Sequence, residues 1–138
     1  MKRLTVLCVD DYPAVRALYL ILLGGYGYDV IAASSAYHAL ELFHARVGKI
    51  DAVIVDHQMP GMNGLELAIS LKGSQPSLPI LMIATSPPAM ETMTPFIDAA
   101  IIKGAPVLQI LSQLELLLSE QAHRRSIAAA DLGSRAHS

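Results

Sequence analysis

Five short apolar runs alternate with longer segments of helical periodicity, and this alternation constrains the fold of the 138-residue chain more than any other feature. Such a pattern is typical of βα units on a parallel sheet. The runs expected to form strands are residues 4–9, 29–33, 52–56, 80–84 and 99–102. We therefore predict an α/β fold, a doubly wound parallel sheet of five strands.

The predicted helices have recognisable start and stop signals. Pro13 suits the first turn of the first helix, which Gly24 and Gly25 should end. Either Ser34 or Ser35 can cap the second helix. For the third helix, which should run to about Lys72, the sequence offers Asn63 as the cap.

The C-terminal part of the chain is less regular. Pro87, Pro88 and Pro95 leave room only for a short fourth helix at about 89–93. Pro106 should start a long last helix that ends near His123. We expect one domain over residues 1–123 and a flexible tail over residues 124–138.

Composition argues against several classes of protein. Although 53% of the residues are hydrophobic and the mean hydropathy is +0.44, the longest unbroken apolar stretch is 17–23. This stretch is far shorter than the roughly 20 residues of a membrane-spanning helix, so we expect no membrane insertion and a cytoplasmic protein. The formal charge of −2 predicts no general attraction to nucleic acid. The single cysteine, Cys8, lies within a strand and is expected to be a buried, inert thiol.

Acidic residues follow two of the predicted strands: Asp10 and Asp11 after the first, and Asp56 at the end of the third. If these strands are parallel neighbours, three carboxylates meet at one edge of the sheet, where open α/β folds bind ligands. Their mutual repulsion calls for a cation or a proton. Taken separately, the pair could be a helix cap and Asp56 a turn residue, but this interpretation does not explain their combination.

A phosphoryl-transfer site would suit these acids. Magnesium binds few protein carboxylates and shares the phosphates of a substrate. An aspartate can attack phosphorus to form an acyl phosphate, whose charge a metal and a lysine would stabilise. The fourth and fifth strands end near Thr85 and Lys103, whose polar groups could bind phosphoryl oxygens.

At these residues the sequence resembles the receiver domain of two-component response regulators, most closely over residues 4–81. The stretch Val9-Asp10-Asp11, followed by Pro13-Ala14-Val15-Arg16, matches the family's acidic pair. The motif Asp56-x-x-Met59-Pro60-x-Met62-x-Gly64 matches its phospho-acceptor loop and is highly specific. The fold expected by this resemblance is flavodoxin-like, with strand order 2-1-3-4-5.

The resemblance also implies roles for individual residues. Asp56 would accept a phosphoryl group from a histidine kinase or a phosphotransfer protein, and Lys103 would contact that group. Asp11, Asp56 and the backbone carbonyl of Gln58 would hold Mg²⁺, or alternatively Mn²⁺, and Asp10 would act through a bound water. Such a protein is a phospho-acceptor that can promote its own phosphotransfer and dephosphorylation, and is not otherwise an enzyme.

The second half of the chain departs from the family pattern. Ala84 stands where a switch Thr or Ser is expected, and Thr85, one place later, is the candidate for a displaced switch hydroxyl. Ala100 replaces the usual aromatic residue, and Gly104 replaces the usual proline after the lysine. The segment between Thr85 and Lys103 is also shorter than usual. We therefore predict an intact acceptor pocket with an atypical readout.

The last helix carries a predicted buried stripe, with two leucines beside it. The stripe consists of Val107, Ile110, Leu111, Leu114, Leu117 and Leu118. Leu108 and Leu116 lie off the stripe and would widen its apolar surface. We interpret them either as a face for a homodimer or another protein, or as residues that fill a gap left by the short fourth helix.

Three functions are compatible with the sequence to different degrees. The leading hypothesis is a single-domain response regulator that signals by binding an unidentified downstream protein. The alternative is a receiver-like interaction scaffold that does not depend on phosphorylation. A metal-dependent phosphatase is disfavoured because Gln58 stands two residues after Asp56, where such enzymes usually have a second acid.

Overall fold

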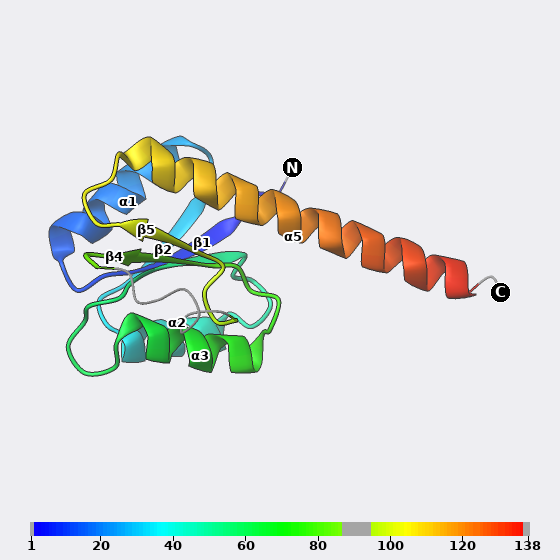
Figure 1. Cartoon of the computed structure of the whole chain (residues 1–138), viewed down its shortest axis with the longest axis horizontal. Helices are drawn as coiled ribbons and strands as arrows, with labels where there is room; N and C mark the ends of the chain where they lie inside the picture. The colour runs from blue at the N-terminus through cyan, green and yellow to red at the C-terminus, as the bar shows by residue number, and fades with distance from the viewer. Residues whose placement is uncertain (1, 87–94, 137–138) are drawn as a thin grey trace.

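A five-stranded parallel sheet forms the centre of the computed structural model, which describes residues 2–86 and 95–136 (Figure 1). The sheet order is β2-β1-β3-β4-β5, so the predicted fold class and strand order are confirmed. The strands are β1 Thr5–Val9, β2 Asp29–Ala33, β3 Ala52–Asp56, β4 Ile80–Ala84 and β5 Ala99–Ile102.

Among the described residues, two helices cover each face of the sheet. On one face lie α1 Pro13–Gly25 and α5 Val107–Ala136, and on the other α2 Ala36–Ala45 and α3 Gly64–Ser74 (Figure 1). Because successive strand side chains point to opposite faces, Leu7 and Val9 join the core under α2 and α3, whereas Val6 and Cys8 join the core under α1 and α5.

The expected helix starts are confirmed. The second helix is capped by Ser35, whose hydroxyl accepts a hydrogen bond from the His38 N–H at 3.1 Å, and this resolves the choice between Ser34 and Ser35. Asn63 and Glu66 form a reciprocal capping box at α3. The short fourth helix expected at about 89–93 lies outside the described residues.

The expected end of the last helix near His123 is wrong, because α5 continues to Ala136. The segment after His123 contains three consecutive alanines, Ala128 to Ala130, and no proline, so its backbone favours the helix. Residues 122–133 are all exposed, and this part of α5 extends beyond the sheet (Figure 1). The boundary of the domain at residue 123 stays a prediction.

The packed face of α5 agrees with the predicted stripe. Leu114 is fully buried, whereas Leu108 is 64% exposed and Leu116 is 52% exposed. This exposure disfavours the interpretation that the two leucines fill a gap. None of the helices in the described ranges combines the length and the apolar character needed to cross a membrane.

Candidate phospho-acceptor and metal site

The topology brings the three acids together. β1 and β3 are parallel neighbours, and Val9 is in register with Val55. The next residues along these strands, Asp10 and Asp56, are therefore level with one another at the carboxyl edge of the sheet. One carboxylate oxygen from each of Asp10, Asp11 and Asp56 lies within 4.8 Å of the others. The convergence predicted from the sequence is present.

Burial makes this cluster electrostatically costly. Asp10 is 3% exposed and Asp56 is 2% exposed, while Asp11 is half-buried. Burial raises the pKa of Asp10, and the nearby charges of Asp56 and Asp11 raise it further. The Tyr12 N–H and the Lys103 ammonium act in the opposite direction on this pKa, without cancelling the rise. The cluster thus favours a proton or a bound cation.

Two buried oxygens of the cluster lack a hydrogen bond and fit a hard divalent cation. Within the described part of the chain, buried Asp11 Oδ1 and Asp56 Oδ2 accept no hydrogen bond. Buried oxygens of this kind are normally satisfied, and carboxylate oxygens are the ligands that Mg²⁺ prefers. Asp10 differs, because its Oδ1 already accepts a hydrogen bond from the Tyr12 N–H at 2.9 Å.

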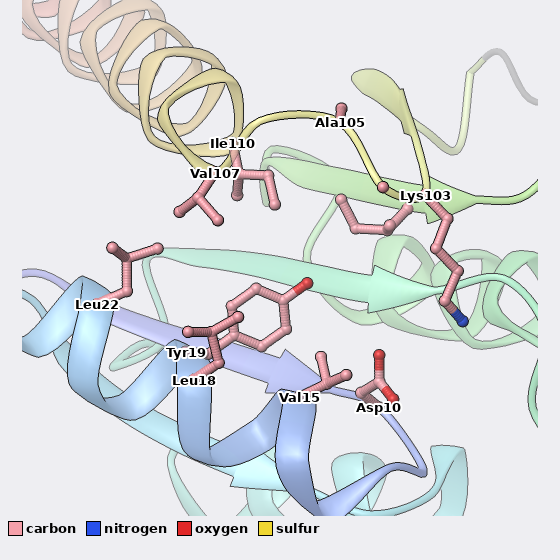
Figure 2. Close-up of a pocket in the computed structure, with 11 residues that line it drawn as sticks. Asp10, Val15, Leu18, Tyr19, Leu22, Lys103, Ala105, Val107 and Ile110 are labelled. Atoms are coloured by element: carbon pink, nitrogen blue, oxygen red, sulfur yellow. The ribbon is translucent and has the colours of Figure 1, made fainter.

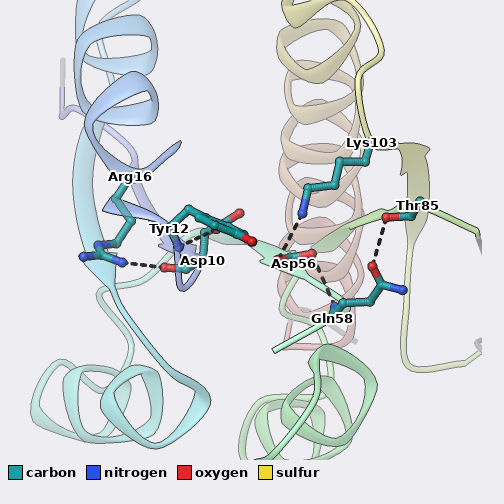
Figure 3. A network of polar contacts seen from close by, with 7 residues as sticks. All are labelled: Asp10, Tyr12, Arg16, Asp56, Gln58, Thr85 and Lys103. Carbon is teal, nitrogen blue, oxygen red and sulfur yellow. Dashed lines mark hydrogen bonds and ion pairs between the residues drawn. The ribbon is translucent and has the colours of Figure 1, made fainter. Parts of the chain in front are cut away.

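Tyr12 and Arg16, which follow the acidic pair in the sequence, hold the loop of that pair in place (Figure 3). The backbone N–H of Tyr12 reaches the carboxylate of Asp10, and the guanidinium of Arg16 donates to the Asp10 carbonyl at 2.8 Å. Neither residue was predicted from the sequence to have this role. The helical position of Arg16, one turn after Tyr12, could have indicated that its side chain points back toward the loop.

The ammonium group of Lys103 lies opposite the acidic residues. Its backbone N–H donates to the Ala84 carbonyl at 2.8 Å, which fixes it at the end of β5. Its Nζ lies 3.5 Å from Asp56 Oδ2 and 5.6 Å from the centre of the Tyr12 ring (Figure 3). The following residue, Gly104, has φ +92°, a conformation that glycine adopts without strain.

The hydroxyl of Thr85 contacts Gln58 and not the acceptor Asp56. It donates a hydrogen bond to Gln58 Oε1 at 2.9 Å, and in the described residues it makes no hydrogen bond with Asp56 (Figure 3). Ala84, where a switch hydroxyl was expected, is fully buried in the core under α2 and α3. The role of Thr85 as a displaced switch stays a prediction.

The acceptor loop after β3 closes tightly on itself. The Gly64 N–H donates to the His57 carbonyl at 2.9 Å. A Cβ atom on Gly64 would lie 2.5 Å from the Asp56 carbonyl oxygen and 2.8 Å from the His57 Cα. Because backbone atoms cannot move aside like the end of a side chain, glycine at this position lets α3 start directly behind the acceptor.

Fold and site together define a domain of the flavodoxin-like class with an acidic cluster at the carboxyl edge of its sheet, and comparisons with known proteins agree. The model of the response regulator receiver domain family matches residues 6–115. The chain therefore belongs to this family, which works in two-component signalling.

Among curated proteins, the chain is 28% identical over 134 residues to the probable transcriptional regulatory protein TcrX of Mycobacterium tuberculosis, covering 94% of this chain and 54% of that protein. It is 35% identical over 80 residues to the autoinducer 1 sensor kinase/phosphatase LuxN of Vibrio campbellii, covering 58% of this chain and 9% of that protein. The chain thus spans about half or less of the length of these relatives.

Solved structures show the same fold. A CheY-like receiver domain protein from Methanospirillum hungatei JF-1 aligns with a TM-score of 0.82 at 22% identity, covering 89% of this chain and 99% of that chain. The response regulator TrrA from Thermotoga maritima, in complex with Mg²⁺-BeF, aligns with a TM-score of 0.75 at 26% identity, covering 83% and 98%.

Proposed function

We propose that Asp56 accepts a phosphoryl group from the phosphohistidine of a histidine kinase or of a phosphotransfer protein, and that the chain signals by binding another protein. The observation that supports this most directly is the ion pair between Asp56 and Lys103, 3.5 Å long, beside Asp10 and Asp11. Sensor kinases among the relatives, such as LuxN, are consistent with a phosphohistidine donor. Cytoplasmic localisation is part of the proposal.

In the proposed reaction a carboxylate oxygen of Asp56 attacks the phosphorus atom. The new O–P bond forms as the N–P bond to the donor imidazole breaks, and the electron pair of that bond stays with the imidazole nitrogen. Lys103 is placed to balance the charge on the phosphoryl oxygens. Burial of Asp56 limits the access of water to the product acyl phosphate.

Magnesium is the proposed cofactor, with Mn²⁺ as an alternative. Asp11 and Asp56 each offer a buried oxygen that accepts no hydrogen bond from the described residues. The carbonyl of Gln58 is the proposed third ligand, and Asp10 would contribute through water. When bound, the ion would neutralise the acidic cluster and the transferred group. In this proposal the Tyr12 N–H keeps Asp10 oriented toward the ion. The structure of TrrA with Mg²⁺-BeF supports the choice of metal.

The test is phosphorylation by acetyl phosphate and Mg²⁺, read as a gain of one phosphoryl group in the intact-protein mass. Asp56→Asn should abolish this gain. The matched control is Asp29→Asn, because Asp29 is an exposed aspartate on β2 whose side chain pairs with Arg3. Labelling that persists in Asp56→Asn would contradict the assigned acceptor.

One observation favours a second candidate, a scaffold that binds its partner without phosphorylation. Ala84 lacks a switch hydroxyl, and the hydroxyl of Thr85 is hydrogen-bonded to Gln58 and not to Asp56. The two functions differ in how partner binding responds to the phosphoryl mimic BeF₃⁻ with Mg²⁺. A response regulator should change its partner affinity on adding the mimic, whereas a scaffold should bind equally in both states and as Asp56→Asn.

A further inference from the structure

A cavity of about 260 Å³ lies between α1 and α5, next to the acceptor pocket (Figure 2). Its apolar walls are formed by Val15, Leu18, Leu22, Ile83, Val107 and Ile110. Asp10 and Lys103 lie together at one end (Figure 2). Gly104 and Ala105 also line the cavity, and their small size leaves this space unfilled where α5 approaches the sheet.

Tyr19 places a polar group inside this apolar space. Tyr19 is only 5% exposed, and its hydroxyl points into the space between α1 and α5 (Figure 2). The hydrogen bonds among residues 2–86 and 95–136 include none to this hydroxyl. Its oxygen is not one of the fully buried unsatisfied atoms, so a molecule in the cavity can reach it. Burial is the main reason that the pKa of Tyr19 is raised, so the group stays a neutral donor at physiological pH.

The walls around the Tyr19 hydroxyl are apolar, and a hydrogen-bond acceptor bound there would satisfy it. A well-held water would need two to four polar partners, and beyond Tyr19 the only polar side chains in the lining are Asp10 and Lys103 at the end. An apolar cavity of about 150 Å³ is sufficient to bind benzene. The space is therefore large enough for an aromatic ring with a small substituent.

The charges in the lining restrict which kind of molecule the cavity can bind. Asp10 and Lys103 are the charged residues that line the cavity, and both lie at one end of it. A charged occupant of either sign beside Tyr19 would find no counter-charge in the apolar walls, and burying an unpaired charge is unfavourable. The remaining class is an uncharged molecule that can accept one hydrogen bond.

We propose that the cavity between α1 and α5 binds a small, uncharged, mainly apolar molecule, whose hydroxyl or carbonyl oxygen accepts a hydrogen bond from Tyr19. This site goes beyond the proposed function, because its occupation does not require phosphorylation of Asp56. Lys103 belongs to both sites, since it lines the cavity and its Nζ pairs with Asp56.

The test is a titration of the unphosphorylated chain with benzyl alcohol, followed by the NMR shifts of the methyl groups of Val15, Leu22 and Ile110. Saturable shifts of these methyls are expected. Toluene, which lacks the acceptor, should bind about three- to tenfold more weakly, and benzoate should not shift them. Tyr19→Phe should remove the preference for benzyl alcohol over toluene while both still bind.

Ala105→Leu tests the place of binding, because the larger side chain should fill the cavity and abolish the saturable shifts. Ala128→Leu makes the same change on the exposed part of α5 and should bind as the wild type does. If Ala105→Leu fails to fold, as judged by thermal unfolding, Val107→Phe replaces it. The proposal is overturned if benzyl alcohol gives no saturable shift, if benzoate binds equally well, or if the filled variant binds unchanged.

Discussion

The hydroxyl group of Thr85 donates a 2.9 Å hydrogen bond to the side-chain carbonyl of Gln58 and so joins the loop after β4 to the acceptor loop after β3. Thr85 follows the buried Ala84, and its own side chain is exposed. A one-residue step along a strand reverses the side-chain direction, which is why the hydroxyl group lies at the rim of the pocket. For the Thr85 hydroxyl to donate to a phosphoryl group on Asp56, its hydrogen bond to Gln58 must break.

Lys103 and Thr85 should therefore contribute unequally to phosphorylation. Lys103→Gln removes the ammonium beside Asp56, and we expect labelling by acetyl phosphate to slow on the order of a hundredfold. Thr85→Val keeps the shape of the side chain and should change the rate by less than about twofold, since it removes no contact with Asp56. A Thr85→Val rate as slow as that of Lys103→Gln would show that Thr85 rearranges onto the acceptor.

Gly64 should be the least replaceable glycine of α3. In Gly64→Ala the new Cβ would collide with the backbone of Asp56 and His57, so we expect the free energy of unfolding to fall by about 2–4 kcal/mol. Gly73→Ala, near the other end of the same helix, meets open space and should raise it by up to about 1 kcal/mol. Urea denaturation of both variants measures the difference. Equal effects would mean that the loop has room to shift.

Cys8 should be unreactive in the folded protein. Burial raises the pKa of its thiol, so the reactive thiolate is scarce and is also shielded from solvent. We expect no reaction with Ellman's reagent at pH 8 until urea unfolds the chain. Because the folded pKa is the higher one, the associated stability is complete below about pH 9, the ordinary pKa of the thiol, and is lost as the pH rises above it. Fast labelling without denaturant would contradict the burial of Cys8.

Leu108 and Leu116 should matter for association and not for folding. Both are more than half exposed, so the double change to glutamate should leave the unfolding temperature within a few degrees of the wild type. If α5 mediates a homodimer, light scattering should show the loss of dimer mass. Leu114→Glu is the matched control, because Leu114 is fully buried and its replacement should unfold the protein. A mass that the double variant leaves unchanged would exclude this face as the dimer contact.

Much of the architecture could be predicted because it depends on local patterns. The apolar runs mark all five strands to within one residue, and the Asn63 cap and Pro13 mark helix starts. The end of α5 could not be placed, because the helix continues beyond Gln121, the last residue described as buried, and no proline follows in the sequence to stop it. For the candidate site, the positions of Asp10, Asp11 and Asp56 at strand ends were sufficient to predict that they converge.

The sequence by itself determined the order of strands and helices along the chain, the acidic residues at the ends of the first and third strands, and Gly64 after the acceptor loop. Each of these features follows from neighbouring residues. Tertiary structure decided which long-range partners these groups have. It placed Arg16 on the Asp10 carbonyl, Thr85 on Gln58, and Tyr19 in the cavity beneath α5. The physical reason is that these contacts depend on side-chain direction and on the packing of elements that are distant in the chain, neither of which a local pattern contains.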